Sequence, residues 1–211
     1  MNLIHLRPFL ALLILLLTRT SALFSQDSFY VCVHFIHGSR PAKEYKEEER
    51  KWRGGTWGGH VGVNIDSNRV IDFKPRGRFH WFSHRNNRHS QFSFHTQAAF
   101  WTYFGTAPET LERTTVRIPV TSQQIKLLDT TATAYVSQCP YDYAFIGMRC
   151  ASASYDILMQ AGVFKKYSRF RCCQLYFYPE KLRKRLLKMA DENRWLVTTG
   201  TGSERRRWDK G

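Results

Sequence analysis

Two segments far apart in this sequence carry side chains that together form the basis of a thiol active site. His60 opens an alternating stretch, Gly59-His60-Val61-Gly62-Val63, and Cys150 opens an apolar one, Arg149-Cys150-Ala151-Ser152. An imidazole beside a cysteine takes the proton of the thiol, and the resulting thiolate is the nucleophile. The pair therefore indicates a cysteine hydrolase or transferase, provided that the fold brings both residues together.

The alternation around His60 predicts a β-hairpin that places a carboxylate beside the imidazole. Apolar residues recur at every second position in 61–65 and again at 71 and 73, so both strands turn an apolar face toward one core. That parity requires a three-residue loop, 66–68, with Asn68 in the left-handed conformation. Gly62 then pairs with Asp72, and His60 becomes a diagonal neighbour of Asp72, about 7–8 Å away at the backbone.

A carboxylate at this position would fix the imidazole tautomer and stabilise the positive charge that develops on proton transfer. The alternative interpretation of His60 is a surface histidine on a half-exposed hairpin. Asp72 is thus the candidate third member of the site.

The residues after Cys150 predict a helix from Cys150 to Ala161, ended by Gly162. A helix start and the charge of Arg149 both favour thiolate over thiol. The alternative is a small buried core residue, the usual state of a lone cysteine. Four further cysteines lack this context and are interpreted as core or pairing residues: Cys32, Cys139, Cys172 and Cys173.

The remaining patterns predict an α+β domain. Strands are expected at 29–36 and 115–120, and a charged loop without regular structure at 38–55. A capping box of Thr121 and Gln124 begins one helix, which stops before Pro140, and another helix begins near Pro179. This last helix is expected to have a solvated basic side: Lys181, Arg183, Lys184, Arg185 and Lys188.

The first 25 residues have the composition of a secretory signal peptide. Arg7 precedes an unbroken apolar run at 9–17, and small residues follow at 21–25. An uncleaved N-terminal anchor is the alternative. The expected organisation is a signal peptide at 1–25, one domain at 26–197 with an insertion at 75–112, and a loosely held basic tail at 198–211, in an exported, periplasmic or extracellular protein.

The net charge of +15 over 211 residues favours anionic partners, although it also fits simple solubility. For an exported protein these partners are envelope polymers or a lipid surface, and nucleic acid is not expected.

A histidine-rich stretch holds His80, His84, His89 and His95. His80 and His84 suit a metal if helical, but the flanking aromatic residues favour a strand-like rim for lipid headgroups or glycan. Neither a metal nor a cofactor is expected, and His34 and His37 are interpreted as structural.

Three segments together resemble a known family. HVGVNIDSNRVIDF and RCASASYDILMQAG resemble the histidine hairpin and the nucleophile helix of NlpC-type cell-wall peptidases, including two spacings of twelve residues. In those enzymes the cysteine comes first. Here the histidine comes first and PYDYAF precedes the cysteine, which is similar to the circularly permuted branch that includes YiiX-like proteins and the lecithin:retinol acyltransferase group. The resemblance covers residues 57–74 and 115–162.

This resemblance implies a circularly permuted papain-like fold, in which an antiparallel sheet packs against a cysteine-bearing helix. It implies Cys150 as nucleophile, His60 as general base, Asp72 as its orienting partner and Tyr141 as a tyrosine that approaches the thiol. The backbone N–H of Cys150 would stabilise the oxyanion.

The expected function is therefore hydrolysis or acyl transfer at an amide or ester of a wall peptide or lipid. One alternative is a non-catalytic basic domain that binds anionic envelope polymers. The other is a nuclease or metal-dependent hydrolase that uses the histidine-rich stretch.

Overall fold

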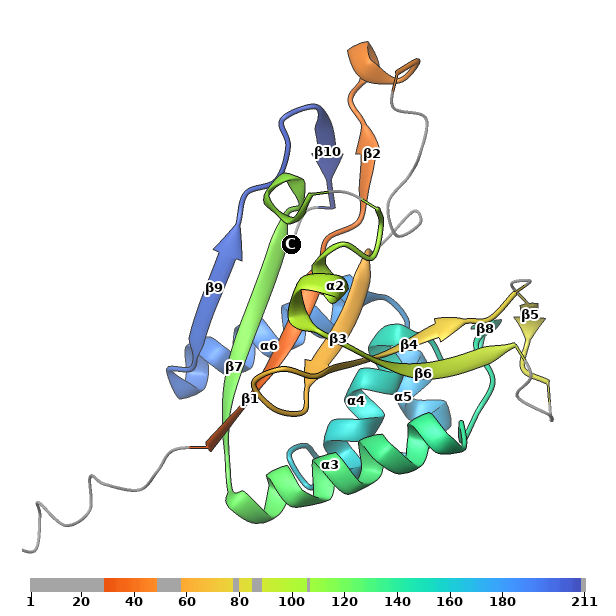
Figure 1. Ribbon diagram of the computed structural model, residues 1–211, viewed down its shortest axis with the longest axis vertical. Coiled ribbons are helices and arrows are strands. Elements are labelled where there is room, and N and C mark those ends of the chain that lie inside the picture. The colour runs from red at the N-terminus through yellow and green to blue at the C-terminus, as the bar shows by residue number, and fades with distance from the viewer. Residues whose placement is uncertain (1–28, 49–57, 78–79, 85–88, 106, 210–211) are drawn as a thin grey trace, which may run out of the picture.

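The computed structural model describes residues 29–48, 58–77, 80–84, 89–105 and 107–209. The predicted signal peptide at 1–25 lies outside these residues. The fold is mixed α+β, with an antiparallel sheet and several helices (Figure 1). Within the described residues, no helix is both long and apolar enough to cross a bilayer.

The main sheet has six antiparallel strands in the order β6-β4-β3-β1-β7-β9. Two short pairs lie outside it, β2 with β10 in antiparallel and β5 with β8 in parallel. The strands are β1 (Phe29–Ile36), β2 (Ser39–Pro41), β3 (His60–Asn64), β4 (Val70–Pro75), β5 (His80–Phe82), β6 (Ser90–His95), β7 (Arg113–Val120), β8 (Ala144–Ile146), β9 (Leu196–Gly200) and β10 (Arg206–Trp208).

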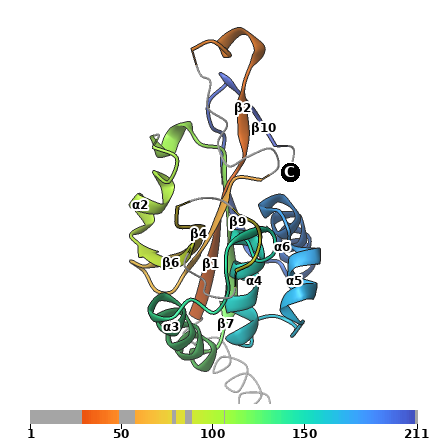
Figure 2. The same cartoon turned by 90° about the vertical axis from the view of Figure 1, so that its right-hand side faces the viewer.

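Helices cover the sheet unequally on its two sides. Figure 2 shows α4, α5 and α6 on one side of the sheet and α2 on the other. The helices are α2 (Gln97–Trp101), α3 (Ser122–Ser137), α4 (Cys150–Gln160), α5 (Arg169–Leu175) and α6 (Pro179–Asn193), with short 3-10 turns at Lys43–Tyr45 and Pro108–Thr110. Every residue of α4 from Cys150 to Met159 is buried, so this helix lies in the interior of the fold.

Strand alternation divides the sheet residues between two cores. On the side of α4, residues such as Val33, Phe35 and Val63 pack with α3, α4 and α6 in the main core. The opposite side, called the outer face here, carries a smaller core of Ile36, Val70, Phe100, Trp101 and Leu111, in which α2 covers the sheet. The polar residues of β3 and β4 share this outer face with the smaller core.

The predicted hairpin register is confirmed. Gly62 pairs with Asp72, and the amide of Ile65 donates to the carbonyl of Arg69 at 2.8 Å across a three-residue loop. The expected left-handed conformation of Asn68 is wrong, because Arg194 is the one described non-glycine residue with a positive φ. Instead, the Asp66 carboxylate accepts the backbone amides of Asn68 and Arg69, both at 2.8 Å, and holds the turn closed.

The ends of the predicted helices also agree with the structure. The capping box of Thr121 and Gln124 is present at the start of α3, and α6 begins at Pro179. Gly162 follows α4 with a φ of +72°. These are local signals, so the sequence around each helix end is sufficient to predict them.

Three expectations for the chain ends and surface are wrong. The C-terminal tail is not loose, because β9 adds to the sheet beside β7 and β10 pairs with β2. The segment at 38–55 contains regular structure in its described part, namely β2 and a 3-10 turn. Arg183 is not on a solvated face: it is fully buried, and its Nη2 lies 3.1 Å from Asp209 Oδ2. All three errors come from long-range pairing that local patterns do not contain.

Candidate active site

His60 and Asp72 form a buried ion pair on the outer face of the sheet. His60 Nε2 lies 2.7 Å from Asp72 Oδ2, and the two residues are 3% and 1% exposed. Gly59 permits this placement, because its φ is +68° and a Cβ would lie 1.6 Å from the carbonyl oxygen of Ile36. Gly62 leaves the space that the Phe100 ring fills above the sheet. The predicted diagonal contact is therefore made, with Nε2 as the nitrogen that faces the carboxylate.

Cys150 completes the arrangement from the start of α4. It is the first residue of the helix, where the backbone N–H groups and the dipole favour an anion. The hydroxyl of Ser152 accepts the amide of Arg149 at 2.8 Å and so fixes the helix start. Helix α4 packs against β3 and β4, and it brings the Cys150 side chain close enough to His60 for the two groups to shift each other's pKa. Because Nε2 of His60 faces Asp72, Nδ1 is the nitrogen available to the thiol.

Electrostatics in this buried site favour a thiolate beside an imidazolium. Burial lowers the pKa of His60, but hydrogen bonds with Asp72 and Cys150 and their negative charges outweigh it and raise the pKa to about 9. Burial raises the pKa of the Cys150 thiol, yet the hydrogen bond and charge of His60 bring it below its ordinary value. The charge of Arg149 and a hydrogen bond from the backbone of Val61 act in the same direction.

A second histidine, which the sequence analysis did not assign to this site, also holds the carboxylate. His95 Nε2 lies 3.1 Å from Asp72 Oδ1, so each carboxylate oxygen faces one imidazole. Burial raises the pKa of Asp72, but hydrogen bonds from His60 and His95 lower it well below its usual range. The alternation of Phe92 and Phe94 predicts that His95 lies on a polar strand face. It does not predict that this strand pairs with β4.

Tyr103 is the second residue that sequence reasoning missed. Its ring stacks on His60 with centroids 3.9 Å apart and an interplanar angle of 10°. Burial raises the pKa of its hydroxyl well above the ordinary value, and the charges of Asp72 and Cys150 add to this effect. Tyr103 follows α2, within the segment 75–112, so this segment covers the His60 ring.

Tyr141, the fourth predicted site residue, has a different partner. It is buried, and its hydroxyl donates to Asp156 Oδ2 at 3.2 Å. Tyr135 donates to the same oxygen at 2.9 Å. The structure therefore brings together Cys150, His60 and Asp72, and places the hydroxyl of Tyr141 in a separate network under α4.

Arg149, the residue before Cys150, lies among aromatic rings. Its guanidinium carbon lies 4.8 Å from the ring centroid of Phe177, 5.3 Å from that of Tyr178 and 5.5 Å from that of Phe145. Such contacts orient a guanidinium without neutralising its charge. Its positive charge therefore remains available to the Cys150 thiolate.

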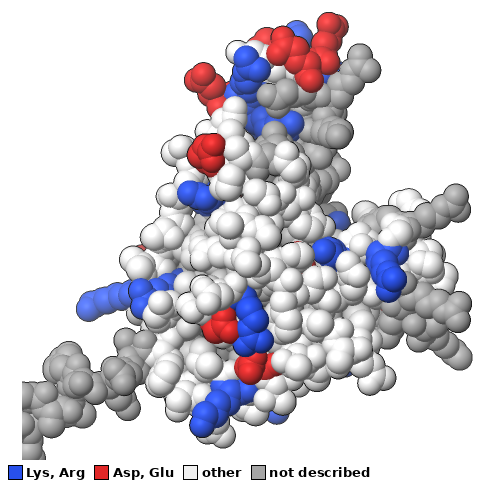
Figure 3. Space-filling view, in the orientation of Figure 1, with Lys and Arg blue, Asp and Glu red and all other residues white. Residues whose placement is uncertain are grey.

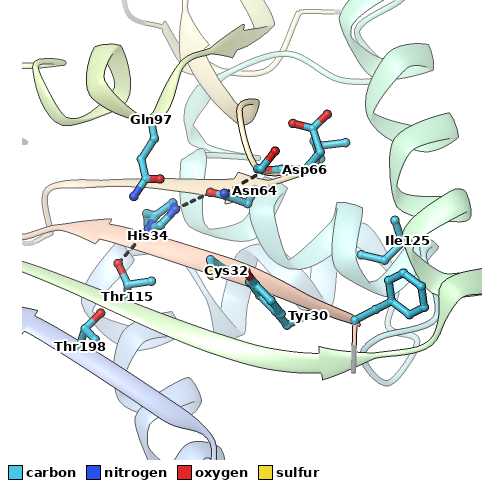
Figure 4. A pocket seen from close by; sticks show the side chains of 12 residues that line it. Tyr30, Cys32, His34, Asn64, Asp66, Gln97, Thr115, Ile125 and Thr198 are labelled. Atoms are coloured by element: carbon cyan, nitrogen blue, oxygen red, sulfur yellow. Dashed lines mark hydrogen bonds between the residues drawn. The ribbon is translucent and has the colours of Figure 1, made fainter. Parts of the chain in front are cut away.

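A pocket of about 670 Å³ opens on the outer face (Figure 4). Cys32 lines this pocket, whereas Cys150 does not. His34 forms its floor. The ring hydrogen-bonds with Thr115 Oγ1 at 2.8 Å and with Asn64 Oδ1, as the dashed lines in Figure 4 show. Burial lowers the pKa of His34 to about 4, so this imidazole is neutral at physiological pH. The predicted structural role of His34 agrees with these neutral partners.

The histidine-rich stretch divides into two parts. The rings of His80, His84 and His89 lie together, with centroids 4.1 to 5.7 Å apart, whereas His95 belongs to the Asp72 network. In the part of the chain that is described, no group of three or more histidine, cysteine or acidic residues is arranged to hold a metal ion.

Comparisons with known proteins give no match for this chain, whether with family models, curated proteins or solved structures. The features of the molecule that bear on its function are therefore those of Cys150, His60 and Asp72.

Proposed function

We propose that this chain is an exported thiol hydrolase or acyltransferase, built on a circularly permuted papain-like fold. The observation that carries the proposal is the buried cluster of Cys150, His60 and Asp72, in which His60 Nε2 lies 2.7 Å from Asp72 Oδ2 and His60 and Cys150 shift each other's pKa. The order of the elements supports the permuted fold, because the histidine hairpin precedes the cysteine helix and packs against it. The apolar run at 9–17 supports export.

The first half of the reaction forms an acyl-enzyme. The Cys150 thiolate attacks the carbonyl carbon of an amide or ester, and a C–S bond forms while the carbonyl oxygen becomes an oxyanion. The N–H of Cys150 at the start of α4 is positioned to donate to that oxygen. The His60 imidazolium gives its proton to the leaving amine or alkoxide, the C–N or C–O bond breaks, and a thioester remains.

The second half returns the enzyme to its starting state. Neutral His60 removes a proton from water or from an acceptor alcohol or amine, which attacks the thioester carbonyl. The C–S bond then breaks, and the thiolate and the imidazolium are restored. Asp72 keeps the ring oriented throughout and stabilises its charge. Water as acceptor makes the protein a hydrolase, and an alcohol or amine makes it a transferase.

Covalent labelling with acyl donors tests the proposal. The intact protein is incubated with an activated wall-peptide ester and, separately, with a lipid ester, and the adduct is located by mass spectrometry. One adduct at Cys150 is expected, with at least one donor class, and the reactive class identifies the substrate. Cys150→Ala should form none, whereas Cys32→Ala, a matched control for a half-buried thiol, should react normally. No adduct from either donor would contradict the proposal.

A second candidate function rests on the net charge of +15. A non-catalytic basic domain would bind anionic envelope polymers in a salt-dependent manner. Its binding would be the same in Cys150→Ala and the parent, and no adduct would form.

A further inference from the structure

The paired strands β5 and β8 expose large apolar side chains. Trp81 and Phe82 are each 66% exposed, and Ile146, directly opposite Phe82, is 57% exposed. This pair lies at one end of the molecule, on the right in Figure 1, outside the main sheet. Single exposed apolar residues are ordinary, but three on neighbouring positions of one short strand pair indicate a contact surface.

Trp81, Phe82 and Ile146 define an apolar tip here, and the sequence on either side of Trp81 and Phe82 is rich in positive charge. The chain from residue 74 to residue 108 has no aspartate or glutamate, and it contains five cations: Lys74, Arg76, Arg78, Arg85 and Arg88. Asp142, near β8, is buried and accepts the backbone amide of His84 at 2.8 Å. Blue side chains without red ones are visible toward this end of the molecule in Figure 3.

The chemistry of the tip favours an anionic bilayer surface over a protein groove. Tryptophan and phenylalanine flanked by arginine are the side chains that settle at the boundary between headgroups and acyl chains. Each cation near an anionic membrane adds roughly 1 kcal/mol of attraction. A narrow projection with apolar groups on two paired strands suits a deformable lipid layer, whereas protein partners require a larger complementary area.

The tip is also connected to the nucleophile. Ile146 lies four residues before Cys150 in the sequence. The ring of its neighbour Phe145 contacts both regions, with its centroid 4.9 Å from that of the Trp81 ring and 5.5 Å from the guanidinium carbon of Arg149. We propose that the β5–β8 pair is a membrane-docking tip, which seats Trp81, Phe82 and Ile146 in the interface of an anionic bilayer and holds Cys150 near its surface. Only the use of this docking to present acyl donors rests on the proposed function.

The test needs a signal that comes from the tip itself, because the apolar run at 9–17 would bind a bilayer independently. The intact protein is mixed with phosphatidylglycerol-containing vesicles whose acyl chains are brominated, and the quenching of tryptophan fluorescence is measured. The parent should show strong quenching. Trp81→Phe should lose the quenched component, and Phe82→Ala combined with Ile146→Ala should weaken tip insertion roughly tenfold.

Matched controls are available elsewhere on the surface. Phe170 on α5 and Leu196 on β9 are 73% and 56% exposed, so Phe170→Ala and Leu196→Ala remove similar apolar surface away from the tip. Neither should change the quenching. Equal quenching in the parent and Trp81→Phe would overturn the proposal, as would an equal loss in the Phe170 control.

Two further measurements test whether the quenching depends on the charge of the vesicle and whether it depends on Cys150. Neutral phosphatidylcholine vesicles should quench much less, and equal quenching would overturn the anionic character of the surface. Cys150→Ala should dock like the parent, so failure of acyl-adduct formation and failure of docking are distinguishable outcomes.

Discussion

Two buried histidines on neighbouring strands of one sheet face have opposite charge preferences. His34 on β1 pairs across the ladder with Gly62, two residues from His60 on β3, and the two side chains are 2% and 3% exposed. The carboxylate of Asp72 and the Cys150 sulfur raise the pKa of His60 to about 9, whereas burial among neutral partners lowers that of His34 to about 4. Two equally buried histidines thus have pKa values shifted in opposite directions, and their interaction partners determine which imidazole carries a proton.

The cysteines show the same contrast. Burial raises the pKa of Cys32, Cys139 and Cys173, and raises that of Cys172 to about 11. Cys150 is the one of the five whose pKa is lowered, because it faces His60 and Arg149. None of the five forms a disulfide. The difference in partners therefore predicts a single reactive thiol.

Removing one or the other histidine should break this comparison most strongly. His60→Ala removes the imidazolium that stabilises the thiolate, so alkylation of Cys150 by iodoacetamide at neutral pH should slow by about 100-fold. His34→Gln, a change at a histidine that is equally buried, should leave the rate unchanged. Peptide mapping after timed labelling measures both, and equal rates in His60→Ala and the parent would contradict the assigned role of His60.

The lowered pKa of His34 should also make the stability of the fold depend on pH. The pKa of His34 is about 4 when folded and near 6.5 when unfolded, so between these values the unfolded chain binds a proton that the folded one does not. The stability that this group contributes is complete above pH 6.5 and is lost as the pH falls through 4, by about 3 kcal/mol.

Urea unfolding at pH 7 and pH 4.5 measures this loss. His34→Gln should show a smaller loss than the parent, because the titrating group is absent. His37, whose pKa burial lowers to about 3, has the same sign but is present in both proteins. An identical loss of unfolding free energy in the two proteins would show that folding does not lower the pKa of His34.

Asp72→Asn should have a smaller effect on reactivity than His60→Ala. The amide keeps the shape but removes the negative charge that supports imidazolium, so alkylation of Cys150 should slow by about tenfold. Asp129→Asn is the control, because Asp129 is a half-exposed carboxylate that pairs with Arg69. A slower reaction in the control would point to a global effect of charge.

Substitution of Tyr103, the tyrosine stacked on His60, should change the alkylation rate of Cys150 least. Tyr103→Ala removes the ring that lies on His60, which should reduce the alkylation rate about threefold. Tyr103→Phe keeps the ring and should behave like the parent. If Tyr103→Phe were as slow as Tyr103→Ala, the hydroxyl rather than the stack would be responsible.

The part of the site that local patterns could predict is the hairpin and the helix start. Alternating apolar residues require the pairing of Gly62 with Asp72, and the helix pattern places Cys150 first. His95 and Tyr103 could not be predicted in this way, since their positions depend on the pairing of β6 with β4 and on the packing of the residues after α2 against His60. The burial of Arg183 and the pairing of the C-terminal strands could not be predicted for the same reason, because their partners lie far away in the sequence.

The family resemblance of the Pro-Tyr-Asp segment did not predict the contacts of Tyr141. Tyr141 and Tyr143 are both buried, and so is Asp142 between them, so only tertiary packing decides which groups each tyrosine hydroxyl contacts. The Tyr141 hydroxyl donates to Asp156, while the charge of Cys150 contributes to raising the pKa of Tyr143. A single sequence motif therefore locates the aromatic segment but not the role of each ring.

Titration of the Cys150 thiol tests the central claim most directly. The ultraviolet absorbance of the thiolate is followed against pH in the parent, and the curve of Cys150→Ser is subtracted to isolate this sulfur. Cys150 is expected to ionise below the ordinary value of 9.0, and this pKa should return toward or above 9.0 in His60→Ala. Ionisation of Cys150 at or above 9.0 in the parent, unchanged by removal of His60, would show that His60 does not activate the thiol.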